Sequence, residues 1–400
     1  MLAKLADPSR PLGRLLAEGY ETEVRQQHLL VSSVPYVNPS GAVRRGTLVC
    51  TYVESGGALL PPDNHQVWFV GEQPCFSNGT PITQIENEHQ RRELAPGLWT
   101  DRRFSNKPAG LTNFATHEDK MLHYLRLLQD QARVLEPTAD ARTGRAIESP
   151  DEESVFRYLD TSSARSETLA LSMRLAMERV AIIGLGGTGS YVLDHLIKTL
   201  IKQIHTFDPD VFLQHNAFRA PGAATLAEIA ARMPKVHYHR LRCDPMHRGI
   251  YPHAYAIDES NVSELSGFDF VFVCVDKGPA RALIARYLIA QKVPFIDVGM
   301  AVEQVPESHS LVGLARATLC TPERNAHFFD CAPTDNDARD ALYRRNIQVD
   351  DLNALNALLA VFMWKQFCGY YANDFNPHHL TFAVSALSLG RSQMAPDAAL

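Results

Sequence analysis

The chain has 400 residues, a formal net charge of −6 and a hydrophobic fraction of 45%, which predicts a globular protein with two domains. The acidic balance disfavours a general nucleic-acid-binding protein, because such proteins carry a basic stripe. The longest apolar stretch, 357–364, is too short to span a membrane, and no secretory signal is expected. The seven cysteines form no C-x-x-C pair, so we expect no disulfide framework, no structural zinc and a cytoplasmic location.

The first part of the chain predicts a small α+β domain. Apolar residues at helical spacing indicate a helix within 9–30, and short apolar runs between turn residues indicate strands and hairpins within 36–83. A strong helical pattern follows at 117–136. The polar stretch 137–154, which contains Pro and Gly, then indicates a domain boundary. The predicted domains are 1–150 and 151–400.

Strands and helices alternate through the second domain, and each strand is a nearly unbroken apolar run. This pattern is typical of a parallel sheet covered by helices on both faces. The predicted fold class is therefore α/β, a Rossmann-like and mainly parallel sheet preceded by the smaller α+β domain. The expected helices lie near 166–178, 189–201, 224–232, 279–291 and 350–371, and the expected strands near 179–186, 203–208, 236–241, 268–276 and 294–299.

A glycine-rich turn joins the first strand of this domain to its helix. Gly184, Gly186 and Gly189 fit the G-x-G-x-x-G pattern of dinucleotide-binding proteins, and Gly187 and Ser190 belong to the same turn. The N–H groups and the positive dipole end of the following helix favour a phosphate. Such turns also occur without ligands, but the surrounding strand–helix pattern favours a nucleotide. The pattern does not distinguish NAD from ATP.

Polar residues after the second strand narrow the choice. Asp208 ends that strand, where a carboxylate can bind the ribose hydroxyls of either nucleotide. Asp210, Asn216, Arg219 and Lys235 follow within a short span. A guanidinium and an ammonium near a phosphate-binding turn suit a triphosphate, although Arg219 or Lys235 taken singly is better explained as an ordinary surface charge.

Asp276 ends the apolar run 268–276, on the ligand side of the predicted sheet. A carboxylate there would face NAD unscreened, whereas beside phosphates it can hold Mg²⁺. It can also cap the next helix, and the two roles are compatible. An NAD-dependent oxidoreductase would explain the glycines and Asp208 but would leave four residues without a role: Asn216, Arg219, Lys235 and Asp276.

The ordered motifs resemble those of the ThiF/MoeB-type adenylyltransferases, the superfamily that includes the ubiquitin-activating enzymes. The motifs are GLGGTGS, FDPDVFLQHNAFR, Lys235, VCVDKGPAR, PFIDVGM and NALLAVFMWKQFCGYY. The resemblance implies adenylation, with ATP and Mg²⁺, of the C-terminal glycine carboxylate of a ubiquitin-like or sulfur-carrier protein, with or without later transfer in a bacterial conjugation or defence pathway. It also implies a homodimer and leaves room for a conjugating-enzyme partner.

The resemblance assigns a role to each matching position. An arginine upstream of the first strand, often reaching across the dimer in the family, would be Arg165, with Arg157 as the second candidate. The glycine loop with Ser190 would hold phosphates. The nucleotide would also contact Asp208, at the ribose, and Asp210. The triphosphate would be contacted by Asn216, Arg219 and Lys235, and Mg²⁺ would be held by Asp276.

The chain departs from the family at its cysteines. Cys320 and Cys331 flank the loop where relatives carry a thioester-forming cysteine, and Cys75 is the thiol to test if the N-terminal module resembles a ubiquitin-conjugating fold. Each is better explained as an inert cysteine, because reactivity needs a lowered pKa. The N-terminal module could instead recognise the carrier.

Other functions remain open at the level of sequence. Within the same family the acidic balance disfavours a tRNA-modifying dehydratase. A scaffold that binds a nucleotide without turnover is the remaining class, and it would bind ATP tightly without consuming it.

Overall fold

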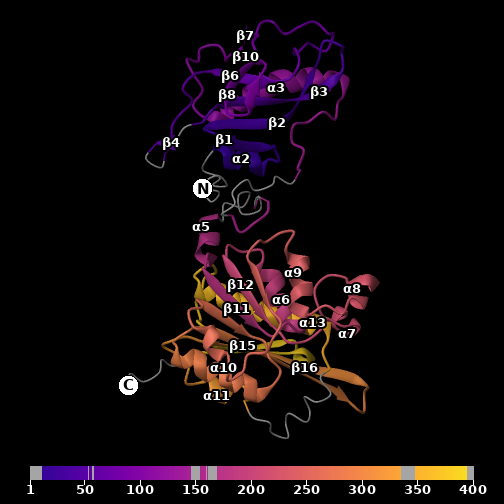
Figure 1. The fold of residues 1–400 in the computed structure, drawn as a ribbon, viewed down its shortest axis with the longest axis vertical. Coiled ribbons are helices and arrows are strands. Elements are labelled where there is room, and N and C mark those ends of the chain that lie inside the picture. The colour runs from indigo at the N-terminus through magenta and orange to yellow at the C-terminus, as the bar shows by residue number, and fades with distance from the viewer. Residues whose placement is uncertain are drawn as a thin grey trace. The chain divides into compact units, whose positions relative to one another are not determined.

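The computed structural model describes residues 11–52, 54–55, 58–145, 154–158, 160, 169–334 and 347–393. The chain forms two compact units (Figure 1), each with its own hydrophobic core. The first unit comprises Met1–Ser154 with Tyr158–Leu169, and the second comprises Val155–Arg157 with Ala170–Leu400.

The first unit is built on a six-stranded antiparallel sheet with the order β1-β2-β3-β6-β10-β7. Its strands are β1 (Thr22–Arg25), β2 (His28–Val37), β3 (Val43–Thr51), β6 (Gln66–Val70), β7 (Glu86–Glu88) and β10 (Arg102–Ser105). Two small hairpins are formed by β4 (Glu54–Ser55) with β5 (Ala58–Leu59) and by β8 (Arg92–Ala95) with β9 (Leu98–Thr100). The helices are α2 (Pro11–Ala17) and α3 (His117–Leu135).

Helix α3 covers this sheet, as its sequence pattern predicts. Thr116 caps the helix by accepting a hydrogen bond from the N–H of Asp119 at 3.0 Å. Met121, Tyr124 and Leu128 are buried in the core that α3 shares with β2 and β3. The helix expected within 9–30 is present but short: α2 ends at Ala17, and the next residues form β1 and β2.

The second unit contains an eight-stranded mixed sheet with the order β13-β12-β11-β14-β15-β16-β17-β18. The first five strands in this order are parallel, and β15 to β18 pair antiparallel. The strands are β11 (Arg179–Ile183), β12 (Gln203–Phe207), β13 (Ile250–His253), β14 (Phe270–Val273), β15 (Phe295–Val305), β16 (Ser310–Cys320), β17 (His379–Ala383) and β18 (Ser388–Ser392).

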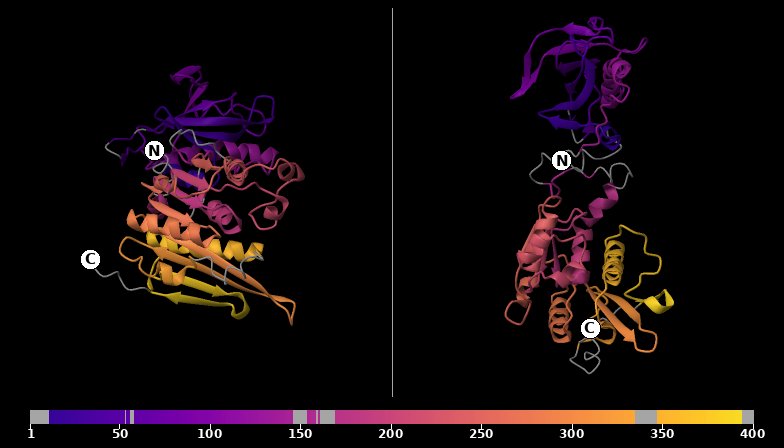
Figure 2. Two further views of the ribbon diagram at one scale, coloured as in Figure 1. Left: turned by 60° about the horizontal axis from the view of Figure 1, so that its bottom comes forward. Right: turned by 90° about the vertical axis from the view of Figure 1, so that its right-hand side faces the viewer.

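Helices cover both faces of this sheet, which confirms the predicted fold class. Val180 and Ile182 pack with residues of α6 and α13 on one face, while Ala181 and Ile183 pack with α10 on the other. Figure 2 shows α13 beside the strands of the orange hairpin β15–β16. The helices are α5 (Leu169–Ser172), α6 (Gly187–Leu196), α7 (Gln214–Ala217), α8 (Leu226–Ala230), α9 (Lys235–Cys243), α10 (Gly278–Ala290), α11 (Phe328–Cys331) and α13 (Asp350–Phe367), with the short 3₁₀ turns η1 (Met173–Leu175), η2 (Val262–Leu265) and η3 (Val384–Ala386).

One predicted strand is wrong. Residues 236–241 lie within helix α9, and the strand at this edge of the sheet is β13. The side chains of Val236, His239 and Cys243 are buried, and their spacing of three and four residues is that of one helix face. Pro234, the residue before the helix, cannot donate a hydrogen bond, which a helix start tolerates well.

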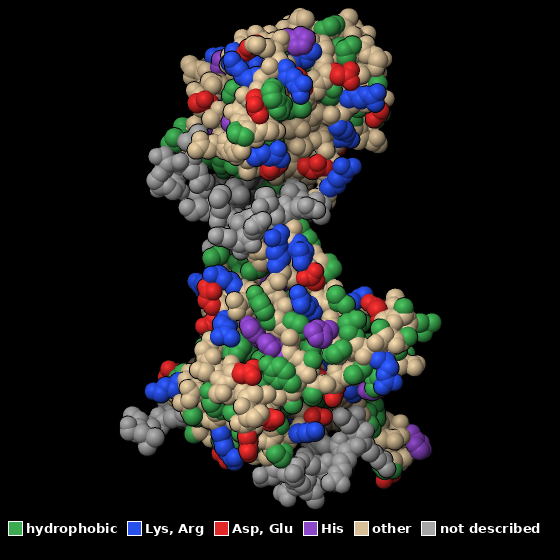
Figure 3. All heavy atoms as spheres, in the orientation of Figure 1, with side chains coloured by type: hydrophobic (Ala, Val, Ile, Leu, Met, Phe, Trp, Pro, Cys, Tyr) green, Lys and Arg blue, Asp and Glu red, His purple; other side chains and the backbone are tan. Residues whose placement is uncertain are grey.

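The described part of the chain contains no helix that is long and apolar enough to cross a membrane. On the face drawn in Figure 3, the Lys and Arg side chains are interspersed with Asp and Glu and do not gather into one basic patch. The distribution on this face therefore matches the mixed composition of the sequence.

His247 is fully buried as a neutral imidazole in the second unit. Its Nδ1 accepts a hydrogen bond from the N–H of Gly249 at 3.0 Å, so Nε2 carries the proton that is donated to the carbonyl of Ile201, also at 3.0 Å. Burial lowers the pKa of His247 to about 4. Protonating Nδ1 would break the bond from Gly249, so the folded state excludes the charged ring. Burial, first among the causes, also lowers to about 4 the pKa values of His205, His239 and His378.

We therefore expect the second unit to lose stability as the pH falls from 6.5, the ordinary histidine pKa, toward 4. In this window the unfolded chain binds protons that the folded chain excludes. Each such histidine contributes up to about 1.4 kcal/mol per pH unit. Urea denaturation followed by circular dichroism between about pH 7 and about pH 5 measures the slope. An unchanged free energy of unfolding across that range would contradict the expectation.

Candidate functional site

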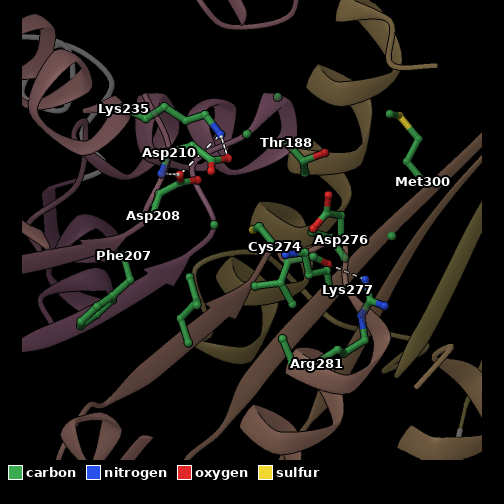
Figure 4. A pocket seen from close by; sticks show the side chains of 18 of the residues that line it. Thr188, Phe207, Asp208, Asp210, Lys235, Cys274, Asp276, Lys277, Arg281 and Met300 are labelled. Carbon is green, nitrogen blue, oxygen red and sulfur yellow. Dashed lines mark hydrogen bonds and ion pairs between the residues drawn. The ribbon is translucent and has the colours of Figure 1, made fainter. Parts of the chain in front are cut away.

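A pocket of about 350 Å³ lies at the carboxyl ends of β11, β12 and β14 (Figure 4). Its walls come from the glycine-rich turn before α6, the segments after β12 and β14, the middle of β15, and α13. Ligands of parallel α/β sheets bind at this edge, because the strand ends and the helix N-termini converge there. The pocket is therefore the candidate site.

The glycines of the turn have separate structural reasons. Gly184 has a φ of +92°, which disfavours any residue with a side chain. A Cβ atom on Gly189 would lie 1.9 Å from the carbonyl oxygen of Gly184, and one on Gly187 would lie 2.4 Å from the Asn353 side chain. Gly186 is open, with no atom within 4 Å of such a Cβ position. The turn therefore packs tightly at Gly187 and Gly189 and has an open side at Gly186.

The open side of the turn, at Gly186, is where a phosphate would bind. Gly184, Gly186 and Gly187 line the pocket, and α6 begins at Gly187. The first N–H groups of a helix have no partner within the helix, and they carry its positive dipole end. Ser190 does not line the pocket: it is buried, and its Oγ donates to the carbonyl of Gly187 at 2.8 Å. Ser190 and Gly189 shape the turn without facing the cavity.

Asp208 holds the turn to the end of β12. One carboxylate oxygen accepts the N–H of Leu185 at 2.7 Å, and the other accepts the N–H of Asp210 at 2.9 Å. The residue is only 5% exposed and lines the pocket. Its carboxylate therefore fixes the loop, and its remaining lone pairs are available to a ligand hydroxyl.

Lys235 brings a buried cation to the same end of the pocket. Its side chain is 7% exposed, and Nζ lies 2.7 Å from the carboxylate of Asp210 and 3.4 Å from that of Asp208. Figure 4 shows these three side chains meeting on one side of the cavity. The Asp210 side chain is 66% exposed, so an anion can approach Lys235 from the open side.

Arg219 and Asn216 are placed differently. Arg219 lines the pocket; burial lowers its pKa, and the carboxylates of Asp276 and Asp210 act in the opposite direction. The Nε of Arg219 is buried and makes no hydrogen bond within the described part of the chain. Asn216 is buried outside the lining, and its Oδ1 accepts the N–H of Leu213 at 2.8 Å. Asn216 therefore shapes the loop that carries Arg219.

Asp276 follows β14 and projects into the middle of the pocket (Figure 4). It is exposed and makes no hydrogen bond or ion pair among the described residues. The backbone before it is fixed, because Arg281 donates through Nη2 to the carbonyl of Val275 at 2.5 Å. The Asp276 carboxylate is therefore free to bind a ligand, while Arg281 fixes the backbone that precedes it.

Arg281 belongs to a buried ion network that the sequence did not predict. Its Nε donates to Asp297 at 2.8 Å, and Nη2 of Arg316 donates to the other oxygen of the same carboxylate at 2.6 Å. Asp297 is fully buried. The network links α10, β15 and β16, three consecutive elements of the chain, and it ties them behind Asp276.

The pocket has a second end that sequence reasoning also missed. Thr188 donates to Oδ1 of Asn353 at 2.9 Å, and Nδ2 of Asn356 donates to the carbonyl of Gly299 at 3.1 Å. These residues and Met300 line the cavity. The signal was two asparagines three residues apart in an otherwise apolar helix, where polar side chains need a buried partner.

The candidate cysteines do not reach the pocket. Cys75 lies in the first unit and is 1% exposed, and burial raises the pKa of its thiol. Cys320, at the end of β16, is 1% exposed, and burial raises the pKa of Cys331 in α11. None of them lines the cavity. Raised pKa values oppose the thiolate that a nucleophile requires.

The lining does contain a different cysteine, Cys274, whose thiol also has a pKa raised by burial. Of the two candidate arginines, Arg165 lies outside the described residues. Arg157 forms an ion pair with Asp244 at 2.8 Å and does not line the pocket.

Comparison with known proteins identifies two regions of the chain. Residues 166–366, about half of the sequence, match the ThiF family. Residues 10–161 match a domain of unknown function, DUF6791. No curated protein sequence matches the chain.

Solved structures resemble part of the chain at low sequence identity. Escherichia coli MccB in complex with MccA-N7isoAsn has 15% identity and a TM-score of 0.47, covering 58% of this chain and 70% of MccB. The same enzyme with ATP gives 16% and 0.46, with 58% and 69% covered. Selenomethionine PaaA gives 14% and 0.42, with 56% and 75% covered.

Proposed function

The chain belongs to the ThiF family, and from this premise we propose that it is an ATP-dependent adenylyltransferase. The observation that carries the proposal is the convergence of three features on one pocket. These are the free N-terminus of α6, the cations Lys235 and Arg219, and the unpartnered carboxylate of Asp276. An NAD-dependent oxidoreductase would need the first feature and none of the others.

The cations suit a triphosphate better than a dinucleotide bridge. Lys235 is held at the pocket wall by two carboxylates, and Arg219 has a buried Nε without a partner among the described residues. Charged donors of this kind bind phosphate oxygens strongly, and a desolvated guanidinium favours an anionic partner. We assign the glycine turn and Asp208 to the nucleotide, with Asp208 at the ribose, and Arg219 and Lys235 to its phosphates.

The reaction needs little covalent help from the protein. A carboxylate oxygen of the substrate attacks the α-phosphorus of ATP, an acyl–O–P bond forms, and the bond to the β-phosphate oxygen breaks to release pyrophosphate. A carboxylate is already ionised at neutral pH, so no general base is required. Lys235 and Arg219 then act by orienting the phosphates and stabilising the charge that develops on them.

Asp276 is the residue that fits a metal ion. It supplies hard oxygen ligands, as Mg²⁺ prefers, and Mg²⁺ is commonly held by one or two carboxylates together with phosphate oxygens. The described residues contain no cluster of three or more His, Cys, Asp or Glu side chains that could hold a metal ion. When bound there, Mg²⁺ would neutralise phosphate charge.

We further propose that the substrate carboxylate belongs to a ubiquitin-like or sulfur-carrier protein, that the enzyme is a cytoplasmic homodimer, and that the module matching DUF6791 recognises the carrier. Family membership supports the first two, and the attachment of a separately folded unit supports the third. The raised pKa values of Cys75 and Cys331 favour an enzyme that adenylates without forming a thioester on these residues.

Thermal unfolding tests the nucleotide assignment. The melting temperature is measured alone, with Mg·ATP and with NAD⁺. A ligand at about a hundredfold excess over its Kd stabilises the folded state by about 2.7 kcal/mol, so we expect Mg·ATP to raise the melting temperature and NAD⁺ to leave it unchanged.

A rise in melting temperature with NAD⁺ and none with Mg·ATP would identify the glycine-rich turn as part of a redox site. Asp276 would then not be a metal ligand. A shift with Mg·ATP that is never accompanied by pyrophosphate exchange, with any carboxylate substrate, would identify a nucleotide-binding scaffold. The two experiments therefore separate all three functions that the sequence leaves open.

A further inference from the structure

A buried carbonyl oxygen at the second end of the pocket lacks a hydrogen bond. Asn356, in α13, is 1% exposed and lines the cavity. Its Nδ2 donates to the carbonyl of Gly299 at 3.1 Å, which fixes the orientation of the amide and leaves Oδ1 as the free atom. That oxygen has no partner within the described part of the chain.

This unpaired state is unusual for a side chain so deeply buried. Buried polar atoms nearly always find a partner, because an unmet one forfeits the hydrogen bond that water would supply. The neighbouring Asn353 shows the ordinary case: its Nδ2 donates to the carbonyl of Val349 at 2.9 Å and its Oδ1 accepts from Thr188 at 2.9 Å. In Asn356, by contrast, the amide nitrogen has a partner, whereas the amide oxygen has none among the described residues. A ligand that satisfies this acceptor must bring an N–H or O–H donor.

The position of Asn356 separates this donor from the nucleotide. Asp208 and Lys235 form one end of the pocket, whereas Asn356 neighbours Gly299 in β15; the glycine turn contacts this second end through Thr188, which donates to Asn353. In Figure 4, Lys235 and Met300 lie on opposite sides of Asp276. Val298 and Met300 add apolar wall to this end. The group that meets Asn356 therefore belongs to the second substrate.

We propose that Oδ1 of Asn356 accepts the main-chain N–H of the residue that carries the reactive carboxylate, which makes Asn356 a specificity-determining residue. In a peptide C-terminus the amide nitrogen and the carboxylate share one α-carbon. A carboxylate held near Asp276 therefore brings a donor at a fixed short distance. The substrate class is then a peptide or protein carboxyl terminus and excludes simple carboxylic acids. This inference rests on the proposed adenylation.

The test uses the full-length protein and ATP–pyrophosphate exchange. Two pools of short synthetic peptides of mixed sequence are compared, one ending in glycine and one ending in N-methylglycine, which lacks the terminal N–H. The wild type should exchange about 10- to 100-fold faster with the glycine pool, the range expected when a buried acceptor is left unpaired. Asn356→Ala should slow exchange with the glycine pool by a similar factor and remove the difference between the pools.

A matched control separates recognition from folding. Asn356→Ala should keep the wild-type rise in melting temperature with Mg·ATP, because the nucleotide end is unchanged. The pool comparison on the wild type needs no variant, so it stands if Asn356→Ala fails to fold. Equal rates with both pools would overturn the inference and leave adenylation standing. Exchange with neither pool would also overturn it, and the thermal shift with Mg·ATP then decides the proposed function separately.

Discussion

Asp276→Asn is expected to slow pyrophosphate exchange about 100- to 1,000-fold while the protein stays folded. The substitution keeps the size of the side chain and removes the charge that we assign to Mg²⁺. Because Asp276 is exposed and makes no hydrogen bond or ion pair among the described residues, its loss should leave the core unchanged. The exchange rate with the glycine-ended pool, measured over a range of Mg²⁺ concentrations, gives the result.

Asp374→Asn is the control for this experiment. Asp374 is exposed, lies after α13 and does not line the pocket, so the same chemical change there should leave exchange within about twofold of the wild type. The Asp276 variant should still show part of the melting-temperature rise with ATP, since Arg219 and Lys235 remain. If Asp276→Asn turns over at the wild-type rate, Asp276 holds no catalytic metal.

Asp297→Asn is expected to lower the free energy of unfolding of the second unit by about 3–5 kcal/mol. This carboxylate is fully buried between two guanidinium groups, with Arg281 at 2.8 Å and Arg316 at 2.6 Å. Asparagine would leave both cations without a counter-charge, although their side chains are only 5% and 10% exposed. Urea denaturation followed by circular dichroism measures the difference.

Asp194→Asn provides the contrast. Asp194, in α6, pairs with Lys198, just beyond the end of that helix, at 2.7 Å, and the two side chains are 37% and 50% exposed. An exposed pair of this kind contributes little, so its loss should cost less than about 1 kcal/mol. Similar losses for the two variants would mean that the buried network is not what stabilises this part of the sheet.

The network also connects stability to the site. Arg281 contacts Asp297 and at the same time holds the carbonyl of Val275, the residue before Asp276. A variant at Asp297 that still folds should therefore place Asp276 less accurately. The variants at Asp276 and Asp297 therefore test two connected features, the exposed carboxylate in the pocket and the buried ion network behind it.

Much of the second unit follows from local sequence alone. Apolar runs of four or five residues predict buried parallel strands, and β11 and β14 contain such runs. The glycine pattern at 184, 186 and 189 predicts the turn, and at two of these positions glycine has a structural reason: Gly184 has a positive φ, and a Cβ atom on Gly189 would collide with the carbonyl oxygen of Gly184. The same kind of local pattern gave a wrong prediction at 236–241. A short run of alternating polar and apolar residues there fits either the predicted strand or the helix α9 that is present.

The sequence by itself determined the fold class of this protein and indicated that the glycine turn, Asp208 and Asp276 meet at one edge of the sheet, because those features depend on residues that are neighbours in the chain or directly follow a strand. Only the tertiary structure decided that Asn216 and Ser190 turn away from the cavity, that Asp297 joins Arg281 and Arg316, and that Asn356 faces Gly299. Each of these depends on which segment lies opposite a given side chain. That choice is made by the packing of α13 and the β15–β16 hairpin on the sheet, and no local pattern encodes it.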